Sequence, residues 1–258
     1  MLDGLASLVI GVCFLTDDRD LQAPSPIGLP EPSMGAVAAW GKRLIVGGPL
    51  DRVDAGRMLD HFGLTVNPGR LVEDESEAVE VAAELAYPVV LKTASTDPRQ
   101  RRDGGGVCAG LADVQQVAAA FQALRDDFGP RVVVTPMVQD AGVEMFLGAH
   151  HDEQLGLLVS LGLSEHAAET PDDVVRAVPP FDAATARRLL DGLRLRALLD
   201  GVHGRPAVNI DALCDAAAKF SAMVGALGEY LSKVEIDPIL VREQDAIVLD
   251  ALIIPRGV

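Results

Sequence analysis

Aromatic and basic residues are both scarce in this sequence. Phe, Trp and Tyr make up only 4% of the 258 residues, whereas hydrophobic residues as a whole make up 49%. The core must therefore be built mainly from Ala, Val and Leu. Lys and Arg number 22 against 38 Asp and Glu, which gives a formal net charge of −16. Nucleic acids and anionic membranes bind basic faces, so this balance argues against either as a partner.

Long apolar runs and patterned cysteines are also missing. No run approaches the roughly 18 apolar residues that a membrane span requires. The apolar N-terminus carries Asp3 where a signal peptide would carry Lys or Arg, and we interpret residues 8–15 as a strand. Cys13, Cys108 and Cys214 show neither metal-ligand nor redox spacing. Cysteines of this kind are typical of reduced thiols, which predicts a cytoplasmic protein.

Turn residues and hydrophobic spacing predict an α+β chain. Residues 1–48 hold one strand, a Pro-rich passage and a short helix, and we interpret them as an α/β remnant followed by a linker. Further along, two Asp residues are each followed three positions later by Glu or Gln, the spacing of a capping box that starts a helix. These pairs are Asp74 with Glu77 and Asp113 with Gln116.

The second half of the chain contains closely spaced strand candidates. We expect strands at 131–138, 143–149, 155–161, 233–241 and 246–253, and helices at 183–199 and 210–227, with Asp182 and Asn209 as helix N-caps. The first three strands are joined by short polar segments typical of hairpins, which predicts an antiparallel sheet. We therefore expect two α+β lobes, residues 49–130 and residues 131–258.

The most informative stretch is Tyr87-Pro88-Val89-Val90-Leu91-Lys92, followed by a polar loop and then Asp103-Gly104-Gly105-Gly106-Val107. An apolar strand that ends in a lone lysine beside a glycine-rich turn is typical of polyphosphate sites. The ammonium supplies positive charge, and glycines let backbone N–H groups approach the anion. The alternative is a lysine at a strand edge beside a solvated loop. Arg99, Arg101 and Arg102 in the loop form either an anion-attracting patch or a surface turn.

A group of acids in the last two strands is the second informative feature. Glu235 and Asp237 lie on one face of a strand, because side chains alternate along it, and Asp250 on the next strand can face the same side. Neighbouring carboxylates need neutralisation, which a hard cation carrying nucleotide phosphates would supply. The alternative is a solvent-facing acidic strip.

Several segments between residues 50 and 255, taken in order, resemble the ATP-grasp portion of the NDP-forming acyl-CoA synthetases, relatives of the β subunit of succinyl-CoA ligase. Residues 85–92 resemble that family's Leu-Gly-Tyr-Pro-Val-Val-Leu-Lys, and residues 234–238 resemble its Leu-Asp-Ile-Asn-Pro. The other matching segments are 103–107, 136–138, 142–144, 198–201, 204–206 and 211–213, with Gly148 and Asp250.

The resemblance implies an ATP-grasp fold, with a nucleotide cleft between its two lobes, and the ligation of a carboxylic acid to coenzyme A. The family uses ATP or GTP with magnesium and passes through an acyl phosphate and a phosphohistidine. By position, the resemblance assigns nucleotide contacts to Lys92, Glu144, Gly105 and Gly106, and the magnesium side to Glu235, Asp237 and Asp250. It also implies a separate CoA-binding α-type partner and a homo- or hetero-oligomer. No catalytic residue is assigned.

Two departures from the family pattern leave the activity open. Gln100 stands where the family carries its phosphate-relay histidine, and Gln is not phosphorylated by that route. The segment Gly162-Leu163-Ser164-Glu165 replaces Gly-Leu-Gly-Gly, which adds side chains and a negative charge where backbone amides would face phosphate. His166 is a substitute phosphate acceptor or a surface-loop residue.

Three hypotheses follow from these departures. The first is the nucleotide-binding subunit of an acid–CoA ligase. The alternative is a degenerate ATP-grasp protein without a phosphohistidine, acting as a nucleotide-binding regulatory or structural subunit. The third is a ligase that uses the acyl phosphate directly. Asp237 in place of the family's Asn still offers an oxygen ligand to a metal.

Overall fold

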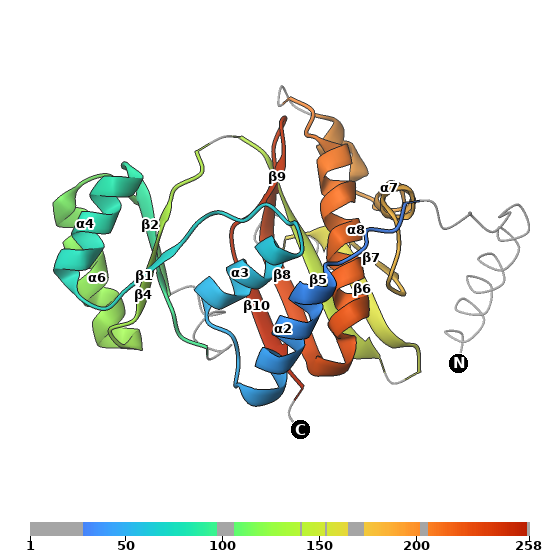
Figure 1. The fold of residues 1–258 in the computed structure, drawn as a ribbon. Coiled ribbons are helices and arrows are strands. Elements are labelled where there is room, and N and C mark those ends of the chain that lie inside the picture. The colour runs from blue at the N-terminus through green and yellow to red at the C-terminus, as the bar shows by residue number, and fades with distance from the viewer. Residues whose placement is uncertain are drawn as a thin grey trace, which may run out of the picture.

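The computed structural model describes residues 28–96, 106–139, 141–152, 154–164, 173–201 and 206–256. These residues form two α+β lobes, a smaller one around a four-stranded sheet and a larger one around a six-stranded sheet (Figure 1). All strand pairs within the two sheets are antiparallel, which confirms the predicted α+β class. In the described ranges, no helix combines the length and the apolarity needed to cross a membrane.

The smaller lobe is a sheet with both of its helices on one face. Its strand order is β1 (Arg70–Val72), β4 (Val132–Pro136), β2 (Val89–Thr93) and β3 (Val107–Leu111), and its helices are α4 (Glu75–Leu85) and α6 (Val114–Phe128). Both predicted N-caps are confirmed, since the carboxylates of Asp74 and Asp113 accept the backbone N–H three residues later at 2.8 Å. The core contains Leu91, Phe121 and Val134 and lies between the sheet and the helices. The other sheet face is left for the site.

The larger lobe is a second sheet with its own core. The sheet path is β10 (Ala251–Pro255), β8 (Leu231–Val241), β5 (Val143–Asp152), β6 (Gly156–Leu163) and β7 (Val174–Ala177), with β9 (Ala246–Val248) also paired to β8. Its helical elements are α2 (Met34–Val46), α3 (Arg52–His61), α7 (Ala183–Asp191), η1 (Arg196–Asp200), α8 (Ile210–Leu227) and η2 (Gly228–Tyr230). Helix α8 crosses the lobe (Figure 1) and buries Leu213, Phe220 and Val224 completely.

The division of the chain between the lobes differs from the expected boundaries at 48 and 130. Strand β4 pairs with β1 and β2, so the smaller sheet extends to Pro136. The predicted hairpin between the strands at 131–138 and 143–149 does not form, because β4 and β5 belong to different sheets. Helices α2 and α3 place Leu44, Met58 and Leu59 in the core of the larger lobe. Local spacing identifies a strand or a helix but not the sheet with which it packs.

One predicted helix and one predicted strand are each interrupted. The helix expected at 183–199 ends at Asp191, because the buried carboxylate of Asp173 accepts the N–H groups of Arg194 (2.9 Å) and Leu195 (2.8 Å), which start a new turn. The strand expected at 246–253 is divided into β9 and β10 by Leu249 and Asp250. That second interruption lies at the functional site.

The chain enters and leaves the smaller lobe at adjacent points. Strands β1 and β4, its first and last, pair with Arg70 opposite Val134 and Val72 opposite Val132. The side-chain amide of Asn67, just before β1, donates to the carbonyl of Pro136 at the end of β4 (3.0 Å). The two connecting segments are therefore joined to each other where they meet the larger lobe.

Candidate functional site

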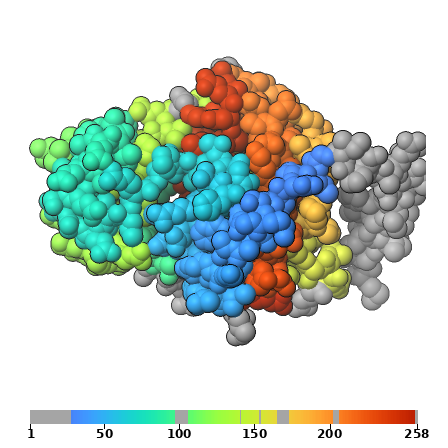
Figure 2. Space-filling model, in the orientation of Figure 1, coloured from blue at the N-terminus to red at the C-terminus, as the bar shows by residue number. Residues whose placement is uncertain are grey.

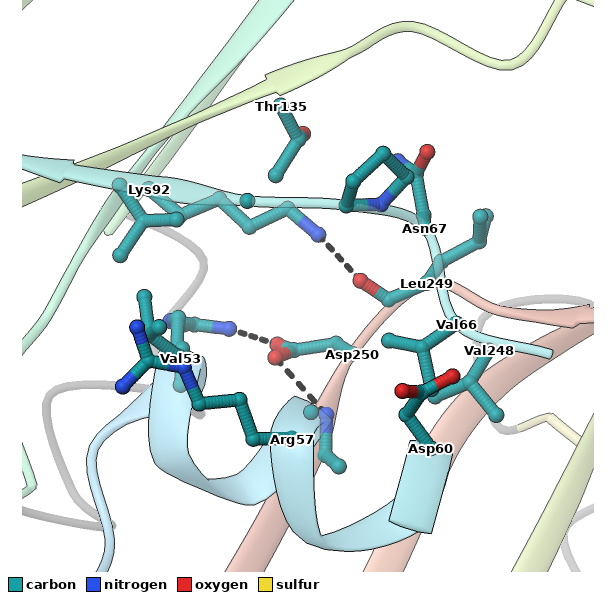
Figure 3. A pocket seen from close by; sticks show the side chains of 16 residues that line it. Val53, Arg57, Asp60, Val66, Asn67, Lys92, Thr135, Val248, Leu249 and Asp250 are labelled. Atoms are coloured by element: carbon teal, nitrogen blue, oxygen red, sulfur yellow. Dashed lines mark hydrogen bonds and ion pairs between the residues drawn. The ribbon is translucent and has the colours of Figure 1, made fainter. Parts of the chain in front are cut away.

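A cavity of about 320 Å³ lies between the two lobes. It is lined by α3, by the segment 66–69, by β2 and β4 of the smaller sheet, and by the turn between β9 and β10. Figure 2 shows the two lobes side by side, and Figure 3 shows the side chains that line the cavity. The site is therefore built by segments from both ends of the chain.

Lys92 reaches from the smaller lobe to the larger one. Its neighbours Leu91 and Thr93 are fully buried, and Leu91 belongs to the core under α4 and α6. Lys92 points to the opposite face of the sheet, is only 8% exposed, and donates from Nζ to the carbonyl of Leu249 at 2.7 Å (Figure 3). The interruption of the last strands at Leu249 makes this carbonyl available. The predicted arrangement, a buried strand that delivers a lysine to a cleft, is present.

The loop that follows Lys92 is described at its two ends, residues 94–96 and Gly106. Gly106 is buried, and its carbonyl accepts the N–H of Thr93 at 2.8 Å, so it lies beside the lysine strand. Gly105 and Gln100, like the arginines between them, lie outside the described residues, as do Glu165 and His166 of the other departure.

Arg52, the first residue of α3, was not singled out from the sequence. It is 8% exposed, its Nε donates to the carbonyl of Thr93 at 2.7 Å, and its Nη1 forms an ion pair with Oδ2 of Asp250. A cation in the first turn of a helix opposes the helix dipole, so Arg directly after the N-cap Asp51 was a signal of a specific role. Its partners are 41 and 198 residues away, which local patterns do not reveal.

The predicted acids occupy one face of the larger sheet. Val234 and Ile236 are fully buried in the core, so Glu235 and Asp237, which alternate with them, face the other side. Asp237 and Asp250 are neighbours across the strands, because the N–H of Asp237 donates to the carbonyl of Asp250 at 3.2 Å. This face therefore continues into the cavity that Asp250 lines.

Glu144 lies on the same face as Glu235. In β5, Met145 and Leu147 are fully buried in the core, which turns Glu144 away from it. Gly148, on the same side of β5 as Glu144, pairs with Glu235 of β8, and directly paired residues share a face. The structure thus brings Glu144 to the sheet face that carries the predicted acids.

Two of the three carboxylates expected on the magnesium side form ion pairs with basic side chains. Asp250 is paired with Arg52, and Glu235 accepts from Nζ of Lys233 at 2.6 Å. Among the described residues, no group of three or more His, Cys, Asp or Glu side chains is arranged to hold a metal ion. Glu235, Asp237 and Asp250 are near one another in the sheet, but they do not form such a group.

The cavity is positively charged within a strongly acidic chain. Arg52, Arg57 and Lys92 line it together with only two acids, Asp60 and Asp250, whereas the chain as a whole carries −16. A concave site with excess positive charge concentrates anions.

Two polar groups on the smaller-lobe side of the cavity can orient a ligand. Thr135 lines the cavity and is 5% exposed, and its buried Oγ1 has no hydrogen-bond partner among the described residues, so a polar group that reached it would satisfy it. Asn67 contributes an amide whose nitrogen is already bonded to Pro136. The lining can therefore bind a small anionic ligand and fix its orientation.

The chain is similar to known proteins over most of its length. Residues 47–254 match the model of a family described as the ATP-grasp domain. The β subunit of acetate–CoA ligase [ADP-forming] I from Pyrococcus furiosus is 29% identical over 213 residues, which cover 80% of this chain and 91% of that subunit. The 4-hydroxybutyrate–CoA ligase [ADP-forming] of Nitrosopumilus maritimus is 27% identical over 195 residues, which cover 72% of this chain but 28% of that longer protein.

Among solved structures, a chain of the dinucleotide forming acetyl-coenzyme A synthetase 1 of Ca. Korarchaeum cryptofilum superposes with a TM-score of 0.76 at 26% sequence identity. The superposition covers 87% of this chain and 100% of that one. That protein was solved in complex with coenzyme A, Ca-AMPCP and HgCl⁺. The likeness extends over both lobes and confirms the fold that the sequence predicted.

Proposed function

Because the chain belongs to the ATP-grasp family over residues 47–254, we propose that it is the nucleotide-binding part of an NDP-forming acid–CoA ligase. The observation that carries the proposal is the position of Lys92. It is a buried lysine on the free face of the smaller sheet, and it extends into a positively charged cavity between the lobes. A compact ammonium in such a place suits the phosphates of a nucleotide.

The nucleotide, ATP or GTP, would occupy the cleft between the two sheets. Lys92 would neutralise its phosphates, Gly105 and Gly106 would let the loop backbone approach them, and Glu144 would contact the nucleotide from the larger sheet. The single excess positive charge of the lining supports this assignment for the phosphates. The position of Glu144 on the same sheet face as Glu235 supports the contact between Glu144 and the nucleotide.

The reaction we propose has two transfers. A carboxylate oxygen of the acid attacks the terminal phosphorus of the nucleotide, the bond to the bridging oxygen breaks, and the nucleoside diphosphate leaves, which yields an acyl phosphate. The sulfur of coenzyme A then attacks the acyl carbon, loses its proton, and releases inorganic phosphate. Charge accumulates on the phosphoryl oxygens in the first transfer. A fixed ammonium such as that of Lys92 stabilises this charge without reorganisation.

The acids expected to face magnesium are a poor fit for a metal ion. They are Glu235, Asp237 and Asp250, and two of these carboxylates already hold the cations of Lys233 and Arg52. Their arrangement among the described residues does not match a three-acid metal site. A divalent ion that accompanies the nucleotide stays a prediction from the family resemblance.

Coenzyme A and the acid would be bound with the help of a partner. The matched P. furiosus protein is named as a β subunit, and the matched part of the N. maritimus ligase is 28% of a longer chain. Both observations favour a CoA-binding α-type subunit beside this chain. The two relatives are named for different acids, acetate and 4-hydroxybutyrate, so we propose a carboxylic acid without naming one. The cytoplasmic location stays a prediction from cysteine usage.

The test is an assay of nucleoside diphosphate formation. The purified chain is mixed with ATP or GTP, coenzyme A and a panel of short, hydroxylated and aromatic carboxylic acids, with and without an α-type subunit from a related ligase. We expect acid- and CoA-dependent ADP or GDP formation only when the α-type subunit is present. Lys92→Ala should lose most of this activity, while Lys42→Ala, an exposed lysine on α2, should keep it.

Two other outcomes separate the competing hypotheses. Nucleotide binding without turnover for any acid would favour the degenerate, regulatory or structural subunit that the replacement of the relay histidine by Gln100 allows. Absence of nucleotide binding would overturn the proposal.

A further inference from the structure

The buried cation of the site, Arg52, is oriented by two acceptor groups, a carbonyl and a carboxylate. Arg52 donates from Nε to the carbonyl of Thr93 and from Nη1 to the carboxylate of Asp250, and its side chain is only 5% exposed. Asp250 is also fixed, because its Oδ1 accepts the N–H of Ala251 at 2.9 Å. Both partners of the ion pair are thus oriented by the backbone, as Figure 3 shows for Asp250.

A divalent metal and Arg52 are competitors for the same carboxylate. Arginine does not lose its charge at any pH at which proteins fold, and its planar fork matches a carboxylate. A metal ion bound to Asp250 would lie beside a buried positive charge that cannot move into water, and it would have to displace an existing ion pair. The same reasoning applies more weakly to Glu235, whose partner Lys233 is 32% exposed.

We propose that Arg52 is the resident cation of Asp250 and takes the place of a divalent metal there. This inference deepens the proposed function, because it concerns the counter-ion of the same nucleotide site. In this chain Asp250 binds Arg52 in place of a metal. Arg52 in turn donates to the main-chain carbonyl of Thr93 in the smaller lobe. The guanidinium and Lys92 line one cavity and together supply positive charge to phosphates. Nucleotide binding should therefore depend little on divalent ions.

The first experiment measures Mn²⁺ binding by electron paramagnetic resonance on the full chain without nucleotide. We expect Asp250→Asn to leave the wild-type titration unchanged. Arg52→Gln should gain a Mn²⁺ site that the double variant Arg52→Gln/Asp250→Asn lacks, whereas Arg52→Lys, which keeps a cation, should behave as wild type. Arg43→Gln is the matched control, since this arginine lies on α2 and pairs at the surface with Asp54.

Each result of this experiment decides the proposal. A wild-type Mn²⁺ site that Asp250→Asn removes would overturn it. So would an Arg52→Gln variant that is folded by circular dichroism and gains no site, because Arg52 would then not be what excludes the ion. If Arg52→Gln does not fold, the comparison of wild type with Asp250→Asn decides alone: an unchanged titration supports the proposal and a lost site overturns it.

The second experiment titrates ATP into the full chain by calorimetry, in EDTA and in MgCl₂ at matched ionic strength. Wild-type affinity should change by less than about tenfold between the two buffers, and Arg52→Gln should show a larger change, with the loss in EDTA. A wild-type affinity that falls more than about tenfold in EDTA would contradict the proposal. Lack of any ATP binding would refute the proposed function alone, because the Mn²⁺ titration tests Arg52 without nucleotide.

Discussion

Arg52 and Asp250 form an ion pair across 198 positions of the chain, with the Arg52 side chain buried and that of Asp250 23% exposed, and the same guanidinium bonds the carbonyl of Thr93. The pair joins the first turn of α3 to the interruption between the last two strands, while the Thr93 bond connects both to the smaller lobe. Lys92, the residue before Thr93, donates a hydrogen bond to the carbonyl of Leu249, the residue before Asp250. Two consecutive residues of β2 are therefore connected to two consecutive residues of the larger lobe, directly or through Arg52.

Removal of the buried partner of this pair, Arg52, should destabilise the protein strongly. Arg52→Ala leaves the Asp250 carboxylate without its partner in a largely buried place, and we expect a loss of about 3–5 kcal/mol in the free energy of unfolding. Urea unfolding followed by circular dichroism measures it. The control is Arg70→Ala, which breaks an exposed pair with Glu84 and should cost less than about 1 kcal/mol. An equal decrease in the free energy of unfolding in the two variants would show that the Arg52–Asp250 pair stabilises the fold no more than an exposed pair does.

Nucleotide should protect the wild-type chain against heat, and Lys92→Ala should remove most of that protection. The variant loses the positive charge that faces the cavity, so phosphates gain less from binding, and a ligand stabilises a fold only in proportion to its binding. Differential scanning fluorimetry with millimolar ATP, with and without magnesium, measures the shift in Tm. Lys42→Ala carries the same substitution on an exposed face of α2 and should keep the full shift. A full shift in Lys92→Ala would remove Lys92 from the site.

The N-cap of α7 should give a stability difference that depends on pH. The pKa of Asp182 lies below its ordinary value of 3.8, because hydrogen bonds from Thr185, including its backbone N–H at 2.7 Å, favour the ionised carboxylate. A carboxyl with a lowered folded-state pKa stabilises the fold fully above its unfolded pKa and loses this effect as pH falls through the folded value. Asp182→Ala should therefore cost about 0.5–2 kcal/mol at neutral pH and less below pH 3.8.

Denaturant unfolding of wild type and Asp182→Ala at several pH values between 3 and 7 tests this expectation. Asp127→Ala, at an exposed position in the last turn of α6, is the control and should change stability by less than about 0.5 kcal/mol throughout. A loss in Asp182→Ala that is constant down to pH 3 would contradict the ionised cap.

The thiol of Cys214 should be inert in the folded protein. Burial raises its pKa to about 11, and the residue is 2% exposed in the core under α8. The thiolate is the reactive form, so both its scarcity and its inaccessibility slow alkylation. Iodoacetamide labelling at pH 8, followed by peptide mass spectrometry, should leave Cys214 unmodified until denaturant is added. Labelling of Cys214 in the native state at the rate of the unfolded chain would show that the core around it opens.

Local features of this fold were readable from the sequence because their causes are local. Asp74, Asp113, Asp182 and Asn209 each accept the backbone N–H three residues later, as their spacing predicted. The apolar strand before Lys92 was identified by the same kind of pattern, and so was the alternation that places Glu235 and Asp237 on one face.

The parts that were missed have causes far away in the chain. The sequence from Ala246 to Ile254 is apolar except for Asp250, and the contacts of Leu249 and Asp250 with Lys92 and Arg52 of other elements lie where the strand is interrupted. The end of α7 likewise depends on Asp173, more than 15 positions earlier. Strands β4 and β5 are separated by only six residues in the chain, yet they join different sheets. The cation at Asp250 could not be foreseen, because Arg52 and Asp250 are 198 positions apart in the chain.

The pairing of β1 with β4 has a consequence for how such a chain can be rearranged. Since Arg70 and Val134 lie opposite each other, the segment between them begins and ends at one place and encloses its own apolar interior. This segment could be deleted as a unit, because a short Gly-Ser linker from Asn67 to Met137 would join the remaining chain without stretching it. The excised segment, in turn, has the geometry to be carried by another protein as an insertion.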